Sequence, residues 1–513
     1  MSESVKAVWP LIRLNPADNV AVARERIDPA QALEAEGVHP QDEIPRGHKI
    51  AIAPIAQGEP VMKYGQVIGF ATTNIAPGQH VHTHNLSVGE FTRDYAIGVD
   101  AVAPKMVPEA ERATFLGYAR PDGRVGTRNY VAVISSVNCS ATVCKAIAQH
   151  FSMPGVMEDF PEVDGAIAIT HGGGCALNTN TEGYHYLTRT LAGYAKHPNV
   201  CGVLMVGLGC ETNQIPSLLE REGLATSDRL RTMTIQASGG TRRTIEAGIQ
   251  AVEELMRAAG TAKRTRQSAA HLLLALECGG SDGFSGISAN PGLGFAADLL
   301  VQHGGTVILS ETPEIFGAEH LLTRRAATPA VAHKLLQRIE WWRDYTRRNQ
   351  AELNNNPSYG NKQGGLTTIL EKSLGAVAKG GTTPLNAVYE YAETITEHGL
   401  VFMDTPGYDP VAVTGQVAGG ANLIAFTTGR GSVSGFKPAP SLKFASNSEM
   451  YHRMSEDMDM DCGTIVTGDD TIENLGERIF ALLIATASGQ TTRSEQLGYG
   501  DNEFVPWQLG AVM

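Results

Sequence analysis

A histidine run near the N-terminus has the residue type and spacing of a metal site. His80, His82 and His84 alternate with other residues, so on a β-strand their imidazoles would share one face. Two imidazoles on one face can both reach a divalent transition metal. His48 could join them from an opposing hairpin. We therefore predict that His48, His82 and His84 bind or adjoin a metal ion, the alternative being an exposed polar strand face.

Cysteines provide a second candidate for a metal centre. Four of the seven closely follow predicted strands, in loops rich in glycine or small polar residues. Ligands bind beyond the carboxyl ends of strands in open α/β sheets, so these loops could converge on one site. However, a free cysteine is more often a small buried hydrophobe, and the separations match neither a zinc ribbon nor a ferredoxin run. An iron–sulfur cluster is therefore kept only as an alternative, with Cys139, Cys175, Cys210 and Cys278 as its ligands.

Charged and amide side chains in further loops could hold an anionic molecule. The chain has 41 Lys and Arg against 54 Asp and Glu, a net charge of −13, so an anionic substrate needs a local cationic site. Arg128 and Arg430 could grip a carboxylate bidentately, whereas Lys362 supplies a point charge and could serve as a base. Asn290 could bind hydroxyl groups. His171 opens a His-Gly-Gly-Gly-Cys run at a predicted strand end, which suits a general base or a metal ligand.

The same charge and the missing motifs exclude several classes of protein. An acidic chain is a poor partner for nucleic acid or an anionic membrane, because both need clustered positive charge. The sequence has no GxxxxGK[ST] loop, no convincing GxGxxG unit and no GxSxG elbow, which disfavours nucleotide cofactors and serine hydrolases. Its apolar runs are too short for a membrane span, no secretory signal is visible, and the cysteines are odd in number and scattered. We expect a cytoplasmic homo-oligomer, a dimer, that binds a small molecule.

Three segments must position these residues. Residues 1–100 are β-rich, and the frame Ile-Ala-x-Gly-x-x-Val occurs at 55–61 and again at 75–81, which predicts two similar hairpin units. Residues 101–115 are typical of a linker. Apolar runs then alternate with helical stretches, which indicates two α/β domains with mainly parallel sheets at 116–265 and 266–513. The expected strands include 130–137, 165–170, 200–208, 272–276, 306–309, 400–403 and 422–427, and the expected helices include 141–151, 184–196, 241–259, 295–303, 331–349 and 471–488.

Distinctive motifs lie at 46–49, 63–70 and 82–85 in the first segment and at 117–129, 207–211, 277–291, 356–362, 371–375 and 428–431 in the rest. These motifs resemble those of the altronate/galactarate dehydratase family, and the resemblance runs through essentially the whole chain. The first 100 residues resemble that family's N-terminal SAF domain, a β-clip. In the related sulfolactate sulfo-lyases the SAF-like and catalytic parts are separate subunits, whereas here they are fused.

The resemblance implies a hydro-lyase that converts a sugar acid to a 2-keto-3-deoxy acid with a divalent metal, typically Fe²⁺, with Mn²⁺ or Mg²⁺ as other options. Removing the proton α to a carboxylate gives an enediolate, which a metal or fixed cations must stabilise. A general base takes the proton and an acid assists departure of the 3-hydroxyl group. We predict His171 and Lys362 as catalytic residues, and the predicted substrate-binding residues are Arg128, Asn129, Asp282, Asn290 and Arg430.

Two branches of the family are mixed in this sequence. The histidine run resembles altronate dehydratases, whereas the segments 125–129 and 136–141 resemble the galactarate branch. The expected substrate is therefore altronate, with galactarate as the alternative. A sulfolactate sulfo-lyase-like C–S lyase and a non-enzymatic sugar-acid sensor are the other functions considered.

Overall fold

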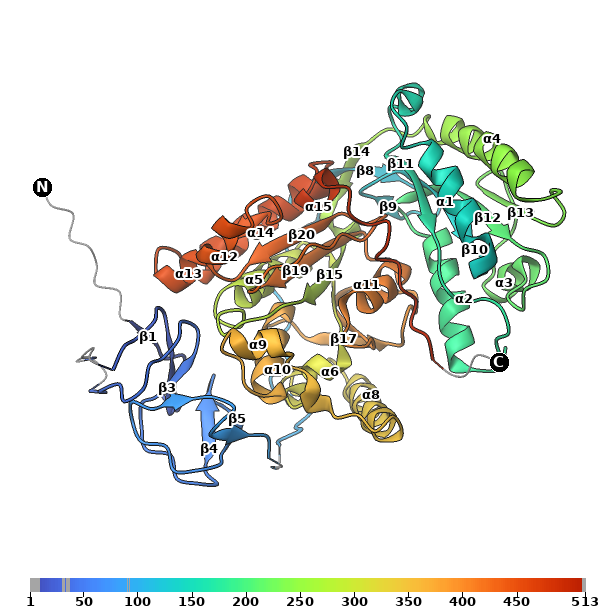
Figure 1. Cartoon of the computed structure of the whole chain (residues 1–513). Coiled ribbons are helices and arrows are strands. Elements are labelled where there is room, and N and C mark those ends of the chain that lie inside the picture. Colours follow the sequence, from blue (N-terminus) through green and yellow to red (C-terminus); the bar gives the residue numbers. More distant parts are fainter. Residues whose placement is uncertain (1–9, 30–32, 34–36, 90, 92, 510–513) are drawn as a thin grey trace, which may run out of the picture.

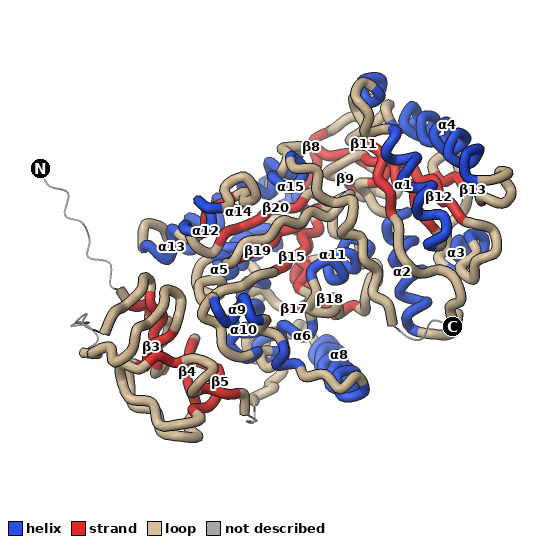
Figure 2. Tube along the Cα trace, in the orientation of Figure 1, coloured by secondary structure: helices blue, strands red, loops and turns tan. Residues whose placement is uncertain are grey.

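The computed structural model describes residues 10–29, 33, 37–89, 91 and 93–509, which form three units in chain order (Figure 1). Strands dominate the first unit, whereas helices and strands alternate in the other two (Figure 2). Every strand pair in the two large sheets is parallel. This arrangement confirms the predicted fold class of a β-rich domain followed by two α/β domains.

The first unit is built from two small antiparallel sheets, with strand orders β1-β2-β3-β6 and β4-β5-β7. The repeated sequence frame brings its two halves together, because Ile55 and Ile75 pair across an isolated bridge. Val61 and Val81 from the same frames are buried in the same core. The strands are β1 (Leu11–Ile12), β2 (Val20–Ala23), β3 (Lys49–Ala51), β4 (Pro60–Lys63), β5 (Gln66–Ala71), β6 (His80–Val81) and β7 (Leu86–Ser87).

The second unit has a four-stranded sheet in the order β11-β10-β12-β13. Successive residues of β10 face opposite cores, which explains its uninterrupted apolar sequence. Val131 and Val133 pack under α1 and α4, whereas Ala132 and Ile134 pack under α2 and α3. The elements are β10 (Tyr130–Ser135), α1 (Ala141–His150), β11 (Gly165–Ile169), α2 (Glu182–Ala195), β12 (Val200–Gly207), α3 (Ile215–Arg221), β13 (Leu230–Thr234) and α4 (Thr241–Ala259).

The third unit has a seven-stranded sheet in the order β17-β18-β16-β15-β19-β20-β21. Helices α5 and α14 cover one face through Leu293, Leu475 and Ile479, and α11 covers the other together with α2 of the second unit. The strands are β15 (Leu273–Cys278), β16 (Thr306–Leu309), β17 (Leu385–Tyr389), β18 (Gly399–Met403), β19 (Leu423–Thr428), β20 (Ser441–Ala445) and β21 (Met460–Asp461). The helices are α5 (Ala289–Gln302), α6 (Thr312–Ile315), α7 (Glu319–Thr323), α8 (Pro329–Arg348), α9 (Tyr359–Gln363), α10 (Ile369–Val377), α11 (Asp409–Ala418), α12 (Ser448–Arg453), α13 (Thr464–Thr467), α14 (Ile472–Ala487) and α15 (Arg493–Gln496).

A small antiparallel sheet of β8 (Thr114–Ala119), β9 (Val125–Gly126) and β14 (Thr265–Ser268) lies where the chain enters and leaves the second unit. Buried polar side chains join the second and third units nearby. His197 Nε2 donates to the Ala421 carbonyl at 2.9 Å, and Asn199 Nδ2 donates to the Pro438 carbonyl at 3.0 Å. The two α/β units are therefore held together by directional bonds as well as by a shared apolar core.

Two predicted boundaries differ from the structure for physical reasons. The helix predicted at 295–303 begins at Ala289, because Pro291 lies in its first turn, where no intrahelical N–H bond is lost. The strand predicted to carry alternating histidines ends at Val81. Asn85 folds the following residues into a turn, in which its side-chain oxygen accepts a bond from the His82 N–H and its own N–H donates to the His82 carbonyl.

Candidate active site

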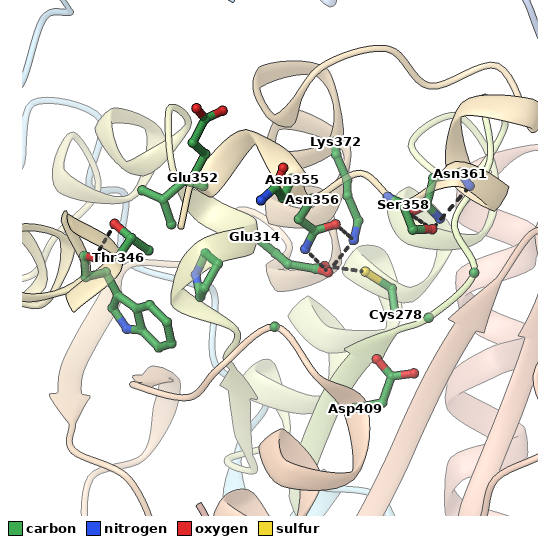
Figure 3. A pocket seen from close by; sticks show the side chains of 16 residues that line it. Cys278, Glu314, Thr346, Glu352, Asn355, Asn356, Ser358, Asn361, Lys372 and Asp409 are labelled. Carbon is green, nitrogen blue, oxygen red and sulfur yellow. Dashed lines mark hydrogen bonds and ion pairs between the residues drawn. The ribbon is translucent and has the colours of Figure 1, made fainter. Parts of the chain in front are cut away.

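A cavity of about 460 Å³ opens at the carboxyl ends of the parallel strands in the third unit (Figure 3). Strand β15 ends at Cys278, and the helices that follow β16 and β18, α6 and α11, supply Glu314 and Asp409. Ligands bind at this edge of α/β sheets because the loops there converge. The other polar walls are Thr346, Glu352, Asn355, Asn356, Ser358, Asn361 and Lys372.

Lys372 and Glu314 form a buried ion pair in the cavity wall. Lys372 Nζ donates to Glu314 Oε1 and, at 2.6 Å, to Asn356 Oδ1. Asn356 Nδ2 and Cys278 Sγ donate to the two oxygens of Glu314 at 3.1 and 3.2 Å. Burial favours the neutral form of each partner, but their mutual attraction outweighs it, so the pKa of Lys372 is raised and that of Glu314 is lowered. The pair is therefore ionised at neutral pH.

Three further acids lie behind this pair. Burial raises the pKa of Glu277 to about 8 and that of Asp409 to about 6, and burial together with neighbouring carboxylates raises the pKa of Glu311. Lys379 Nζ donates to Cys278 Sγ at 2.8 Å and lies 3.8 Å from Glu311 Oε2. Buried like charges at this density are characteristic of functional sites.

The backbone at Glu311 is strained. Its φ of +64° is left-handed, a conformation that costs energy for a residue with a side chain. The position is held by the Glu311 N–H, which donates to Thr405 Oγ1 at 2.8 Å, and by the Glu311 carbonyl, which accepts from the Glu314 N–H at 2.7 Å. The strain turns the chain after β16 so that Glu311 and Glu314 both approach the cysteine at the end of β15.

A cluster of four histidines lies in the first unit. His48 Nδ1 and His80 Nε2 are 3.0 Å apart, and the His48 and His82 rings stack with their centroids 4.9 Å apart. The His84 ring is 5.4 Å from that of His80. Burial, followed by the neighbouring imidazoles, lowers the pKa of His80 to about 3, and burial lowers that of His82 to about 4. The two imidazoles are therefore neutral at pH 7, the form that binds metal ions.

Helix α9 connects the histidine cluster to the cavity. His48 Nε2 and His82 Nε2 donate to the carbonyls of Gln363 and Lys362 at 3.1 and 2.9 Å. Asn361, one residue earlier, lines the cavity and donates to the Ser281 carbonyl at 2.8 Å. The first unit thus contacts the same short helix that forms part of the cavity wall.

A second contact between these units is fully buried. The carboxylate of Glu371, next to Lys372 in α10, accepts bonds from Lys49 Nζ and Lys63 Nζ of the first unit. Thr367 also donates to it through its N–H and hydroxyl groups, at 3.0 and 2.6 Å. Despite burial, the two ammonium groups hold the pKa of Glu371 well below its usual range.

Comparison with known proteins matches all three units. Family models match residues 9–89 (altronate/galactarate dehydratase SAF domain), 117–260 (D-galactarate dehydratase/altronate hydrolase, second domain) and 269–512 (D-galactarate/altronate dehydratase, C-terminal). The chain belongs to the altronate/galactarate dehydratase family.

Similar curated proteins cover nearly the whole chain. Altronate dehydratase of Bacillus subtilis is 34% identical over 493 residues, which are 94% of this chain and 96% of that protein. Galactarate dehydratase (L-threo-forming) of Escherichia coli is 33% identical over 500 residues, 95% and 94% of the two chains. Altronate dehydratase of Escherichia coli is 34% identical over 489 residues, 94% and 96%. The predicted family and the hydro-lyase class are confirmed.

Within this dehydratase, Arg128 is committed to internal bonds, and its role in substrate binding stays a prediction. Its guanidinium donates to both oxygens of Glu495, at 2.6 and 2.8 Å, and to the carbonyls of Thr127, Thr486 and Gln490. All of its nitrogen atoms are therefore engaged, and the residue is 3% exposed.

Three other predicted substrate ligands are also committed to internal bonds. Asn129 accepts from Arg120 at 2.9 Å and donates to the Glu162 carbonyl at 2.7 Å. Asn290 donates to the Gly375 carbonyl and accepts from Thr427. Asp282 accepts bonds from the loop 284–285 and from Ser446 and Asn447. These bonds shape the loops around the site, and Asp282 and Asn290 also line a small second cavity. The substrate-binding roles of all three residues stay predictions.

The side chains of Arg430 and Lys362 are free to take the roles predicted for them. Arg430 is exposed, and its N–H donates to the carbonyl of Gly280, a cavity residue, at 2.8 Å. Among the described residues, no side-chain hydrogen bond engages Arg430 or Lys362. Lys362 lies on α9, one residue after Asn361. Both remain predictions as substrate-binding and catalytic residues.

His171 and the candidate cysteines are distributed over the second and third units. His171 Nε2 donates to the Ser135 carbonyl at 3.1 Å and Nδ1 accepts from the Gly173 N–H at 3.1 Å. Its catalytic role stays a prediction. Cys278 is buried beside Glu314 and Lys379 in the third unit, and the alternative cluster of four cysteines also stays a prediction. The exposed Cys139, Cys175 and Cys210 follow β10, β11 and β12 of the second unit.

The cavity acids and Lys372 were missed by sequence reasoning as functional residues. Glu277 and Lys372 stand inside motifs that carried the family resemblance, at 277–291 and 371–375, which was a usable signal. Glu311, Glu314 and Asp409 lie outside those motifs. No helix among the described residues is long and apolar enough to cross a membrane.

Proposed function

We propose that the protein eliminates water from a six-carbon sugar acid, altronate in the first instance and galactarate as the alternative, to give a 2-keto-3-deoxy acid. The observation that carries the proposal is the ionised Lys372–Glu314 pair in the wall of a polar cavity. The curated proteins similar to this chain are named as altronate and galactarate dehydratases. The cavity offers the amides and hydroxyl that a polyhydroxy acid would need.

Each polar group has a defined part in this reaction. Glu314, a carboxylate at neutral pH, takes the proton α to the substrate carboxylate. The Lys372 ammonium faces the negative charge that develops on the enediolate and can protonate the leaving hydroxyl group. Asn356, Ser358 and Asn361 orient the remaining hydroxyl groups. Arg430, at the edge beside Gly280, grips the distal end of the substrate.

We propose the histidine cluster as the site of the divalent metal expected from the family resemblance, on the strength of one close pair of ring nitrogens. His48 Nδ1 and His80 Nε2 converge, while the bonds from His48 and His82 to carbonyls of α9 fix the ring orientations. Neutral imidazoles suit Fe²⁺ better than Mg²⁺. We propose His48, His80, His82 and His84 as the residues that hold it, which adds His80 to the predicted set. When bound, such an ion would supply a Lewis acid for substrate oxygens.

A coupled assay for 2-keto acid tests the proposal. The purified chain is incubated with a panel of aldonates and aldarates under Fe²⁺, Mn²⁺ and Mg²⁺, and sulfite release from sulfolactate is measured in parallel. Turnover of altronate or galactarate is the expected result. Sulfite release alone would indicate the C–S lyase, and binding without turnover under every metal would indicate a sensor.

The iron–sulfur alternative has its own readout in the same preparation. Protein purified without oxygen would show a broad visible absorbance if the four cysteines Cys139, Cys175, Cys210 and Cys278 held a cluster. We expect no such band, and an activity that follows added Fe²⁺.

A further inference from the structure

The segment 503–509 has no helix or strand of its own, yet specific bonds fix its path. The Val505 N–H donates to Thr414 Oγ1 at 3.0 Å, and the Trp507 N–H donates to the Tyr391 hydroxyl at 3.2 Å. Figure 1 shows the segment, in dark red, running between α11 of the third unit and α2 of the second. It is therefore ordered by contacts with the units on either side of it.

Trp507 joins the two α/β units through stacked aromatic rings. Its indole stacks on that of Trp342 in α8, with the ring centroids 5.4 Å apart and the planes inclined by 7°. It also stacks on Tyr186 in α2, with the centroids 5.4 Å apart. Stacked aromatic rings restrict one another's orientation as well as burying apolar surface. The position of the Trp342 indole therefore depends on Trp507.

Trp342 connects this stack to the wall of the cavity. It lines the cavity, and its Nε1 donates to Asp404 Oδ1 at 2.7 Å. The same carboxylate oxygen accepts from Thr312 Oγ1 at 2.5 Å. Thr312 is the first residue of α6, and Glu314 is the third. One oxygen atom thus joins Trp342 to the helix that carries the cavity carboxylate.

Helix α6 depends on such support because it has only four residues. A helix of this length makes too few internal hydrogen bonds to hold itself in place. Its N-terminus is anchored by Asp404 and by the Thr405 carbonyl, which accepts from the Thr312 N–H at 3.0 Å. Asp404 is fully buried, and its other oxygen, Oδ2, accepts no hydrogen bond from the described residues. The hydrogen bonds of Asp404 are therefore those of Oδ1.

We propose that Trp507 is a positioning residue for Glu314. Its stack on Trp342, together with the bonds of Asp404 Oδ1, holds α6 and so places the Glu314 carboxylate in the cavity. The inference rests on the proposed function, in which Glu314 takes the α proton. A displaced base slows the reaction more than it weakens substrate binding, and a displacement of about 1 Å can lower a rate about 100-fold.

Steady-state kinetics of three variants tests the stack. Trp507→Leu removes the ring and should lower kcat at least tenfold, with KM within threefold of wild type. Trp507→Phe keeps an aromatic ring and should keep kcat within threefold of wild type. Phe504→Leu is the matched control and should leave kcat unchanged, because Phe504 lies in the same segment but packs against Tyr194, at a centroid distance of 4.7 Å.

A second pair of variants tests the hydrogen bond to α6 and decides the inference if Trp507→Leu does not fold. Thr312→Val nearly preserves the shape of the side chain but removes the hydroxyl donor, so kcat should fall at least tenfold with KM nearly unchanged. Thr312→Ser keeps the donor and should keep kcat within threefold of wild type.

Hydrogen exchange of the Trp342 indole N–H gives a readout that does not depend on turnover. The full chain, which has four tryptophans, is isotope-labelled at the indole nitrogens and transferred to heavy water, and exchange is followed by nuclear magnetic resonance. Trp342→Phe assigns the signal. The Trp342 N–H should exchange at least tenfold faster in Trp507→Leu than in wild type, whereas Phe504→Leu should match wild type.

Two results would overturn the inference: wild-type kcat in Trp507→Leu, or in Thr312→Val if the first variant does not fold, and exchange of the Trp342 N–H in Trp507→Leu at the wild-type rate. If the wild-type chain dehydrates no sugar acid, the proposed function fails. Faster exchange in Trp507→Leu would even then support the link from Trp507 to the cavity wall.

Discussion

Glu371 Oε2 lies 2.9 Å from Lys49 Nζ, and both side chains are fully buried at the contact between the first and third units. Lys63 Nζ lies 2.9 Å from the other oxygen, so one carboxylate holds two ammonium groups out of water. Glu371 precedes Lys372 on α10, and this contact therefore fixes the helix that carries the charged centre of the cavity.

Glu371→Gln should destabilise the protein by about 3–5 kcal/mol, because it leaves two buried ammonium groups without a counter-charge. Urea unfolding measures the loss. Glu449→Gln is the matched control: it removes an exposed ion pair with Arg46 across the same pair of units and should cost less than about 1 kcal/mol. Equal losses in the two variants would contradict the role given to Glu371.

Lys372→Met should lower kcat/KM at least roughly 100-fold, since one preorganised donor to a developing oxyanion has an effect of that size. Steady-state kinetics on the best substrate of the panel measures it. Lys334→Met, which alters a lysine 42% exposed on α8, should leave kcat/KM unchanged. A Lys372→Met enzyme within threefold of wild type would remove this residue from the chemistry.

His80→Ala should remove most of the bound Fe²⁺ and the activity that depends on it, because His80 faces His48 at 3.0 Å. Metal analysis after anaerobic reconstitution gives the readout. His39→Ala, which changes an exposed histidine of the same unit, serves as the control and should keep full iron content. Iron retained at the wild-type level in His80→Ala would place the metal elsewhere.

Arg128→Lys should lower thermal stability while leaving KM unchanged. Lysine cannot reproduce the paired bonds to Glu495 together with those to three carbonyls, and each lost charge-assisted bond costs about 1.5–3 kcal/mol. Thermal unfolding and substrate titration measure the two effects. A raised KM with unchanged stability would restore the substrate role predicted from sequence.

Lowering the pH should lower the free energy of unfolding through His197, which joins the two α/β units. Burial lowers the pKa of His197 to about 3, from an ordinary value near 6.5. The unfolded chain therefore takes up a proton that the folded chain excludes, and stability falls as the pH drops below about 6.5, by about 1.4 kcal/mol per pH unit. His197→Gln should remove this one-proton contribution and so reduce the slope in unfolding experiments between pH 6.5 and 5, while the half-buried His80 and His82 keep theirs. An identical slope in both proteins would contradict it.

The sequence by itself determined the main strands and long helices and the family. Uninterrupted apolar runs such as 131–137 specified strands buried on both faces, and the amphipathic stretch 241–259 specified α4, because these signals depend only on neighbours along the chain. The duplicated frame around Ile55 and Ile75 likewise predicted a β-rich unit of two similar halves. The histidine run was found in the same way, since its members are local.

Only the tertiary structure decided which charged residues share a site. Glu277, Glu314 and Lys372 come from three distant segments, and no local pattern says that they share one site. Conversely, Arg128 and Asn290 have the residue types of substrate ligands but are saturated by internal partners. Hydrogen bonding and burial depend on which side chains folding brings together. In the cavity, the parallel sheet decides this, because it aligns the ends of β15, β16 and β18.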